Sequence, residues 1–348
     1  MTSRERVLLA IDGKRTDRIP TDYHSHDSVT LALIDKLGVT DQEELLRALG
    51  IDMRRVQFNH RLPDVGPDSD GYMRNLWGLR YRSDDPDQGR YTGIWPFDEN
   101  TTVDDVDNHE WPDASELDYS QVKPQCEKYG GQFATFGAPW SPFFHEVAWT
   151  IGQENFFVWM TTKPDVVQAL IDRVVDFEVQ ATRLFLEAAD GMVDIAYFGN
   201  DFGTQRGLFV SPQMYDRFLR RPLKRFFDVA KEFGCRVMKH SCGAVRSIIP
   251  WFIEDGVDIL DPVQTAAAGM GLGGLLSDFG DRLCFHGAMD TQFVLPQSTT
   301  GEVRAKVNDH RQLSRDRGRY ILCGSQEYMD DIPLDNLLAM YDENRKIG

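Results

Sequence analysis

The sequence predicts an α/β fold, a (β/α)8 TIM barrel, on three observations. Short apolar runs alternate with amphipathic helical segments along most of the 348 residues. Polar residues able to do chemistry follow many of these runs. The hydrophobic fraction of 41% and the charged fraction of 27% are ordinary for a globular chain with a large core. We therefore expect one barrel domain over residues 1–348, with its functional side chains where strands end and loops begin.

The expected strands are the apolar runs in chain order, at 18–25, 54–58, 132–138, 193–200, 236–242, 257–262, 283–288 and 320–324. The clearest expected helices lie at 164–188, 212–233, 245–254 and 300–315. Two of them carry a proline in the first turn, after Lys163 and after Ser211.

Residues 62–122 interrupt the alternation and are rich in Asp, Gly, Pro and aromatic residues. Within them, 76–81 and 90–95 resemble the two strands of a β-hairpin. We expect this segment to be an insertion at the barrel mouth, because long loops there usually serve substrate binding.

The net charge of −17, from 38 Lys+Arg and 55 Asp+Glu, excludes several partners. Such a surface repels phosphate backbones and anionic lipids, so we expect neither a nucleic-acid nor a membrane partner. No run of about 18 apolar residues and no secretory signal is present, which predicts a cytoplasmic protein. The five cysteines are odd in number and widely spread, so each is expected to be a core thiol or a ligand.

The strongest local signal for a metal site is His240 and Cys242 at the end of the fifth expected strand, with Cys323 at the end of the eighth. The ends of separated barrel strands converge on one mouth, and alternation places His240 and Cys242 on one face. One imidazole and two thiolates leave zinc an open fourth position. The alternative is that both cysteines are small buried thiols and that His240 binds a substrate without metal.

Asp201 follows the fourth expected strand, with Gln205 close behind it. A carboxylate and an amide at a strand end can accept a proton and orient a substrate. Asp201 could equally cap the following segment through a side-chain hydrogen bond to the backbone.

Other strand ends supply further candidates for substrate binding: His24, His26, His60, Gln264 and Asp290. Alternation along the first strand would place His24 and His26 on one face, suited to a second metal or to gripping a carboxylate. Gln264 and Asp290 could instead satisfy loop backbone groups.

Several motifs resemble the uroporphyrinogen decarboxylase superfamily over nearly the whole chain. They are Asn200-Asp-Phe-Gly-Thr-Gln, His240-Ser-Cys-Gly, Gly256-Val-Asp-Ile-Leu-Asp-Pro-Val-Gln and Phe285-His-Gly-Ala-Met-Asp. The resemblance implies a (β/α)8 barrel with its site at the carboxyl ends of the strands. The true decarboxylase has an arginine-rich segment after the first strand, but this chain reads Thr21-Asp-Tyr-His-Ser-His-Asp there. Without those arginines, a porphyrinogen bearing many carboxylates is disfavoured.

The other branch that the chain resembles contains corrinoid-dependent methyltransferases and O-demethylases. That resemblance implies Zn2+ on His240, Cys242 and Cys323, with Asp201 and Glu327 managing protons. It also implies a small methyl donor or acceptor, such as an aryl methyl ether or a thiol, and a cobalamin (corrinoid) usually carried on a separate corrinoid protein. A homodimer is one expected assembly.

Two other functions remain open from the residues. One is a metal-free, decarboxylase-like lyase acting on a small carboxylic acid or a porphyrinogen through Asp201 and the histidines. The other is a non-catalytic protein that only binds a corrinoid or another tetrapyrrole. The metal content of the purified protein separates the methyltransferase from the lyase.

Overall fold

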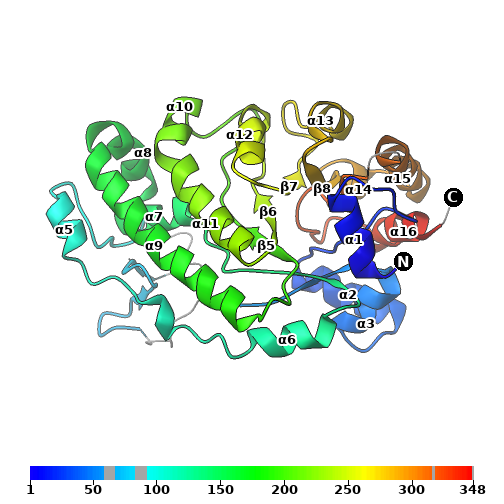
Figure 1. Ribbon diagram of the computed structural model, residues 1–348, viewed down its shortest axis with the longest axis horizontal. Coiled ribbons are helices and arrows are strands. Elements are labelled where there is room, and N and C mark those ends of the chain that lie inside the picture. Colours follow the sequence, from blue (N-terminus) through cyan, green and yellow to red (C-terminus); the bar gives the residue numbers. More distant parts are fainter. Residues whose placement is uncertain (59–66, 83–91, 316–317, 347–348) are drawn as a thin grey trace.

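A curled parallel sheet forms the centre of the computed structural model, which describes residues 1–58, 67–82, 92–315 and 318–346. Its seven strands follow chain order: β1 (Met53–Arg55), β4 (Ala134–Phe136), β5 (Ile195–Phe198), β6 (Arg236–His240), β7 (Ile259–Val263), β8 (Cys284–Met289) and β9 (Tyr320–Gly324). Helices surround the sheet (Figure 1). The predicted α/β barrel is thereby confirmed, and each of these strands overlaps an expected run.

The first expected strand, 18–25, is reduced to a short extended segment that closes the barrel. Leu322 donates its N–H to Pro20 O at 2.8 Å, and Asp22 donates to Leu322 O at 3.0 Å. On the other side Asp52 donates to Thr21 O at 3.0 Å. The segment is short because Pro20 lacks an N–H for the ladder, and its pairing consists of bridges at Thr21 and Ser25.

The helices of the described chain are, in order, α1 (Ser3–Ile11), α2 (Asp27–Leu37), α3 (Gln42–Leu49), α5 (Val103–Asp107), η2 (Ala114–Glu116), α6 (Val122–Tyr129), α7 (Phe143–Ile151), α8 (Gln153–Thr162), α9 (Pro164–Ala188), α10 (Pro212–Tyr215), η3 (Asp216–Arg220), α11 (Arg221–Glu232), η4 (Arg246–Ile248), α12 (Ile249–Glu254), α13 (Leu272–Phe279), α14 (Val294–Gln297), α15 (Thr300–Ser314) and α16 (Leu334–Arg345). Among the described residues, no helix has the length and apolar character that a membrane crossing requires.

The expected helices are present, with two local departures. The segment 212–233 contains a π-helical stretch, η3, between α10 and α11. Pro222 lies in the first turn of α11 and cannot donate an N–H, which favours a wider turn before it. The segment 245–254 begins as the 3-10 turn η4 before it becomes α12.

The described part of the insertion contains a small antiparallel sheet that packs on α9. Strand β2 (Met73–Arg74) pairs with β3 (Arg80–Tyr81), and Arg80 exchanges backbone hydrogen bonds with Ile94 at 3.0 and 2.9 Å. The expected pairing of 76–81 with 90–95 is thus found at Arg80 and Ile94, whereas 83–91 lie outside the described residues. Trp77 is buried, with its ring 5.2 Å from that of Phe177 on α9.

The barrel interior holds its own apolar cluster, which α1 closes at the amino ends of the strands. Val7 and Ile11 of α1 join inward-facing residues of the sheet, which are Met53, Ala134, Phe136, Ile195, Tyr197, Met238, Ile259, Cys284 and Ile321. In Figure 1 α1 lies near both termini, and α5, α7 and α8 lie at the opposite end of the molecule.

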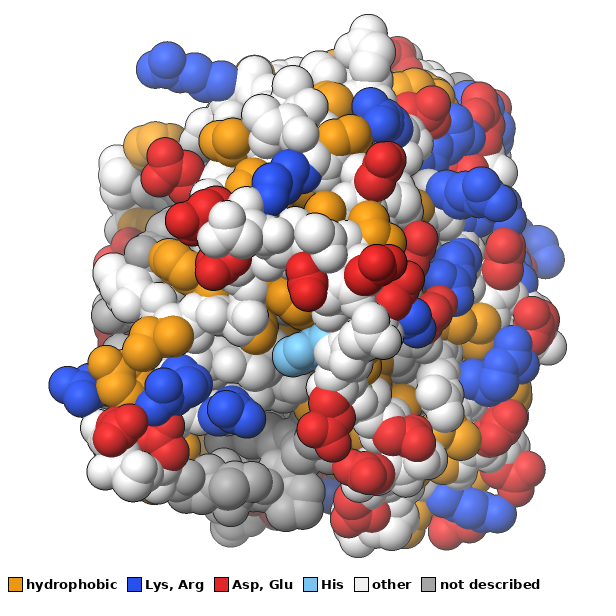
Figure 2. Space-filling model, turned by 90° about the vertical axis from the view of Figure 1, so that its left-hand side faces the viewer, with side chains coloured by type: hydrophobic (Ala, Val, Ile, Leu, Met, Phe, Trp, Pro, Cys, Tyr) orange, Lys and Arg blue, Asp and Glu red, His pale blue; other side chains and the backbone are white. Residues whose placement is uncertain are grey.

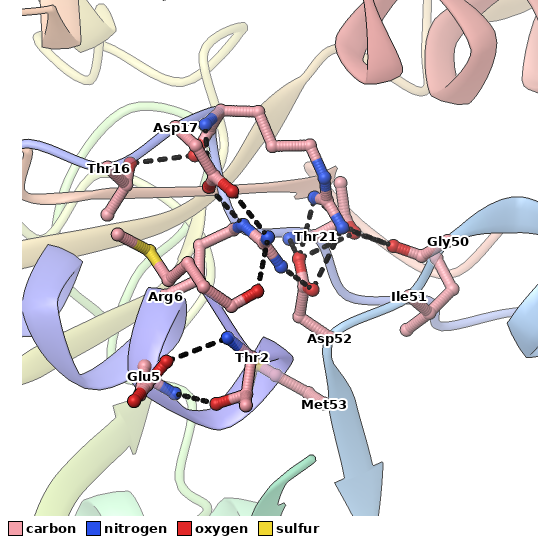
Figure 3. A network of polar contacts seen from close by, with 12 residues as sticks. Thr2, Glu5, Arg6, Thr16, Asp17, Thr21, Gly50, Ile51, Asp52 and Met53 are labelled. Atoms are coloured by element: carbon pink, nitrogen blue, oxygen red, sulfur yellow. Dashed lines mark hydrogen bonds and ion pairs between the residues drawn. The ribbon is translucent and has the colours of Figure 1, made fainter. Parts of the chain in front are cut away.

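An ion-pair network fastens the closing segment to β1 (Figure 3). The buried carboxylate of Asp52 accepts from Arg6 and from Arg18, each at 2.7 Å. It also accepts from the backbone N–H of Thr21 at 2.9 Å. A buried carboxylate needs such partners to stay charged. These cations therefore hold the closing segment, 18–25, beside β1.

Candidate functional site

Polar side chains form a layer inside the barrel on the carboxyl-end side of the apolar cluster, and Tyr197 belongs to both. Along a strand, residues i and i+2 face the same side. The inward-facing apolar residues Ile195, Met238, Ile259 and Cys284 are therefore followed two positions later by Tyr197, His240, Asp261 and His286. All four polar groups lie toward the carboxyl ends of β5 to β8, where barrels place their chemistry.

Asp261 lies between two histidines at the centre of this layer. Its Oδ2 is 2.7 Å from His240 Nδ1, and its Oδ1 is 2.6 Å from His286 Nδ1. The hydroxyl of Tyr197 donates to Oδ2 at 2.6 Å. One buried carboxylate thereby fixes the ring orientation of two imidazoles.

The row continues to a carboxylate at each end. His286 Nε2 lies 3.2 Å from Asp22 Oδ2, and His240 Nε2 lies 3.2 Å from Asp201 Oδ1. Carboxylates and imidazoles therefore alternate across the barrel mouth, in the order Asp22, His286, Asp261, His240, Asp201.

The charges in this row reinforce one another. Burial would lower the pKa of His240, but hydrogen bonds to Asp201 and Asp261 outweigh it and raise that pKa well above its usual value. Burial also opposes ionisation of Asp201 and Asp261, yet the neighbouring histidines hold the pKa of both carboxyls below the usual range. Without a metal, His240 and its two carboxylate neighbours thus stabilise one another's charged forms.

Two glycines allow the loops after β5 and β6 to touch backbone to backbone. A Cβ on Gly203 would lie 2.6 Å from Cys242 O, and one on Gly243, at φ 81°, would lie 2.5 Å from the backbone of Gly203. Within this contact Cys242 N donates to Asp201 Oδ1 at 3.0 Å. The close approach brings Asp201 and Cys242 together from different strands.

A buried lysine binds the backbone just after β5. Lys239 Nζ donates to the carbonyl oxygens of Gly199 and Asn200, at 2.5 and 2.8 Å, and to that of His240. Asn200 has φ 96°, and its side chain bonds to Phe144 N and Ser141 O. Burial lowers the pKa of Lys239 to about 7. These contacts fix the backbone that carries Asp201.

Asp201, His240 and Cys242 form a candidate metal centre. One ligand atom from each lies within 4.8 Å of the others. Carboxylate oxygen, imidazole nitrogen and thiolate sulfur are all zinc ligands. Because His240 Nδ1 is engaged by Asp261, its Nε2 is the atom left to face Asp201 and Cys242. Metal-binding histidines commonly have their other ring nitrogen hydrogen-bonded to a carboxylate in this way. The donor set therefore fits a zinc ion.

Cys323 does not join that group. It lies within β9, and its Sγ is 3.9 Å from the hydroxyl of Tyr328. Burial, together with the charges of Asp22 and Asp261, raises the pKa of its thiol well above the usual value. The structure brings together two of the three predicted ligands, and Asp201 is the third member of the group.

A cavity of about 580 Å³ opens beside the polar row. Asp22, Asp261 and His286 of the row line the cavity, together with Tyr197. Figure 2 shows the end of the molecule where α5 and α8 lie, with a histidine exposed near the middle of a surface on which acidic and basic side chains intermingle. The cavity gives a small molecule access to the groups that hold His240.

A family model described as uroporphyrinogen decarboxylase (URO-D) matches residues 100–347, well over half of the chain. The chain belongs to the uroporphyrinogen decarboxylase family. The matched region contains β4 to β9 and the three residues of the candidate metal centre. The resemblance inferred from the motifs is thereby confirmed.

Two proteins from Methanosarcina mazei are similar to this family member. The curated methylated-thiol–coenzyme M methyltransferase is 25% identical over 277 residues, which cover 74% of this chain and 68% of that protein. A solved structure of a methyltransferase superposes with a TM-score of 0.65 at 18% identity, covering 99% of this chain and 98% of the other. The structural likeness supports the barrel fold.

Two of the predicted site residues of this family member line the cavity. His24 and Glu327 both contribute to its wall, with His24 Nε2 3.9 Å from Glu327 Oε1. Burial lowers the pKa of His24, although Asp261, Glu327 and Asp22 act in the opposite direction. Their roles in substrate binding and proton transfer stay predictions.

Other predicted residues have structural partners instead. His26 is the N-cap of α2 and accepts a hydrogen bond from Ser28 N. Asp290 accepts from three backbone N–H groups at the start of α14, those of Gln292, Phe293 and Val294. The expected common face of His24 and His26 stays a prediction, since the chain is extended up to His26 and the helix begins at Asp27.

The two predicted glutamines lie beside the metal centre. Gln264 Oε1 accepts from Gly243 N at 2.8 Å and lies 3.5 Å from Gln205 Nε2. Gln264 thus holds the loop that carries Cys242. His60, the remaining candidate, lies outside the described residues.

Asp261, His286 and Tyr197 were not among the predicted site residues. A signal was available, because each lies two positions after an apolar residue of a strand and so faces inward with it. Arg55 carries the same signal, two residues after Met53.

Proposed function

We propose that this protein is a zinc-dependent methyltransferase. In this proposal a methyl group moves between a small methylated compound, or a thiol, and a corrinoid carried on a separate protein. The observation that carries the proposal is the group of oxygen, nitrogen and sulfur donors formed by Asp201, His240 and Cys242. The methyltransferase among the relatives supports it.

Three protein ligands leave the zinc ion an open fourth position, as in catalytic rather than structural sites. When bound, zinc would supply Lewis acidity that favours a thiolate at neutral pH. Asp201, His240 Nε2 and Cys242 Sγ would hold it, whereas Cys323 is enclosed beside Tyr328.

The remaining residues of the row would orient the ligands and the substrate. Asp261 accepts a hydrogen bond from His240 Nδ1 and so leaves Nε2 for the metal. If Asp201 binds the ion, Glu327 is the other carboxylate predicted to manage protons, and it lies at the cavity wall with His24 beside it. An aryl methyl ether is a further candidate substrate.

The charges of the cavity argue against the family's namesake substrate. Six carboxylates line it, against three permanent cations: Asp22, Asp27, Asp41, Glu43, Asp261 and Glu327 against Arg54, Arg55 and Lys128. A porphyrinogen with many carboxylates would meet net repulsion there.

The test combines metal content with methyl transfer. Protein purified without chelator is analysed for zinc and then incubated anaerobically with cob(I)alamin and a panel of methyl thioethers, aryl methyl ethers and methylamines. We expect about one zinc per chain and a cobalt spectrum that changes to methylcobalamin. His240→Ala should abolish both, whereas His26→Ala, at a helix start, should not. The proposal would be overturned if the purified protein contained no zinc and if His240→Ala transferred methyl groups as the wild type does.

A further inference from the structure

We propose that Arg55 binds a single carboxylate of the substrate, so that the substrate class of this enzyme is a small monocarboxylate carrying the methyl group or thiol. The part of the inference that concerns the methyl group or thiol rests on the proposed function. The part that concerns the carboxylate rests only on the residues of the cavity.

The strand register directs Arg55 into the barrel. Met53, two residues earlier on β1, belongs to the interior cluster, so Arg55 faces the same side one step nearer the mouth. Arg55 lines the cavity and pairs in register with Phe136 of β4. Its guanidinium carbon lies 5.7 Å from the centre of the Tyr197 ring.

Arg55 is also the cavity arginine left without an acidic partner among the described residues. Arg54, its neighbour, points to the other side of the strand and pairs with Glu43 at 2.7 Å. The carboxylates of the row are already engaged, Asp22 with His286 and Asp261 with both histidines. No ion pair within 4.0 Å joins Arg55 to a carboxylate of the described chain, although its side chain is exposed to the cavity.

A guanidinium in this setting selects a carboxylate over other groups. Its planar N–H donors match the two oxygens of a carboxylate. The carboxylates of the cavity wall repel any second negative charge on the ligand. One anionic group is therefore attracted at Arg55, and further ones are repelled elsewhere in the cavity.

The surroundings of Arg55 indicate how the rest of the ligand would lie. Phe136 and Tyr197 contact each other with ring centres 5.7 Å apart and offer an apolar wall next to the guanidinium. The hydroxyl of Tyr197 lies 3.2 Å from His240 Nδ1. A single tyrosine side chain thus spans from Arg55 to a residue of the candidate metal centre. A small organic acid held by its carboxylate at Arg55 would extend along this wall toward the metal centre.

The test measures binding, which requires no methyl transfer. Isothermal titration calorimetry compares matched pairs of carboxylate and carboxamide, with 4-methoxybenzoate and 4-methoxybenzamide as one pair and short methylthio acids and their amides as the others. The variants are Arg55→Gln, Arg55→Lys and the control Arg282→Gln. Arg282 is an exposed arginine that precedes β8 at the opposite end of the barrel.

We expect the wild type and Arg282→Gln to bind at least one carboxylate about tenfold or more tightly than its amide, as a charge-assisted pair implies. Arg55→Gln should lose this preference and keep amide binding, and Arg55→Lys should retain part of it. Equal affinities for acid and amide in the wild type, no carboxylate binding at all, or a preference that survives in Arg55→Gln would each overturn the inference.

The two proposals fail separately. A carboxylate preference that depends on Arg55, without zinc and without methyl transfer, would refute the proposed function alone. Methyl transfer that proceeds equally well from acids and amides, and equally in Arg55→Gln, would refute the carboxylate site alone.

Discussion

Two thiols of this barrel, Cys242 and Cys323, have similar sequence surroundings but different environments. Cys242 lies two residues beyond the end of β6, is half-buried, and has an imidazole and a carboxylate beside it. Cys323 lies inside β9, is buried, and faces the hydroxyl of Tyr328. Position relative to the strand end therefore decides which thiol other donors can approach.

The charges around the two thiols differ as their positions do. Burial raises the pKa of Cys242, but the hydrogen bond and charge of His240 act to lower it. Burial and the charges of Asp22 and Asp261 all raise the pKa of Cys323. Behind Cys323, Tyr328 and Tyr341 join their hydroxyls at 2.8 Å, and Tyr341 donates to Asp22 O. The pKa of both thiols is raised, but of these two only Cys242 has a neighbouring imidazole that favours its thiolate.

The sharpest way to break the comparison is to remove each sulfur in turn and measure zinc affinity. An apparent zinc binding free energy of about 10 kcal/mol, shared by three ligands, gives about 3 kcal/mol for each, which is more than about 100-fold in affinity. We expect that loss for Cys242→Ser and an affinity within about threefold of wild type for Cys323→Ser, measured by competition with a chelating dye. Zinc loss in Cys323→Ser would assign the third ligand to Cys323, as the motif predicted.

His286 lies in the row between the two regions and should make stability depend on pH. Burial opposes its protonation, but the charge of Asp261 and the hydrogen bonds to Asp22 and Asp261 raise its pKa from 6.5 to about 9. The stabilisation is therefore fully present below pH 6.5 and is lost as pH rises through about 9. Its upper limit is about 3 kcal/mol.

Urea unfolding of metal-free protein between pH 6 and 10 measures this effect. His286→Gln should flatten the decline of the unfolding free energy with pH, and His26→Gln, at the exposed start of α2, should leave it as in wild type. An unchanged pH profile in His286→Gln would show that the imidazole is not charged in the folded protein.

Asp261 should matter to the metal centre without touching the ion. Because its carboxylate orients His240 through Nδ1, Asp261→Asn should lower zinc affinity by about 10- to 100-fold. Asp290→Asn is a matched control, since Asp290 caps the start of α14. Equal zinc affinities in the two variants would contradict the role given to Asp261.

The smallest expected effect concerns the free energy of unfolding, to which Cys323 should contribute more than Cys242. In metal-free protein, Cys323→Ala should lower the unfolding free energy by about 1–2 kcal/mol, because it leaves a small void in a buried layer. Cys242→Ala should change it by less than about 0.5 kcal/mol, as is usual for a partly exposed side chain. Thermal and urea unfolding measure both, and a greater loss for Cys242→Ala would contradict the comparison.

Much of the site could be predicted from local pattern. His240 and Cys242 carry the strand-end signal that predicted them, and the motif around Asn200-Asp-Phe-Gly placed Asp201 in the same mouth. The inward position of Asp261, His286 and Arg55 was also available from the two-residue period of their strands. The capping contacts of His26 and Asp290 could not be foreseen, because a helix cap and a ligand use the same side chains.

The sequence by itself determined the alternation of strands and helices, and hence the barrel, because hydrophobic periodicity acts over a few residues. It also determined which residue types stand at each strand end. Only the tertiary structure decided which of them meet. The contact between the loops at Gly203 and Gly243 brought Asp201 to Cys242, and the tyrosines enclosed Cys323. Those distances depend on how strands far apart in the chain curl around one core, which no local pattern specifies.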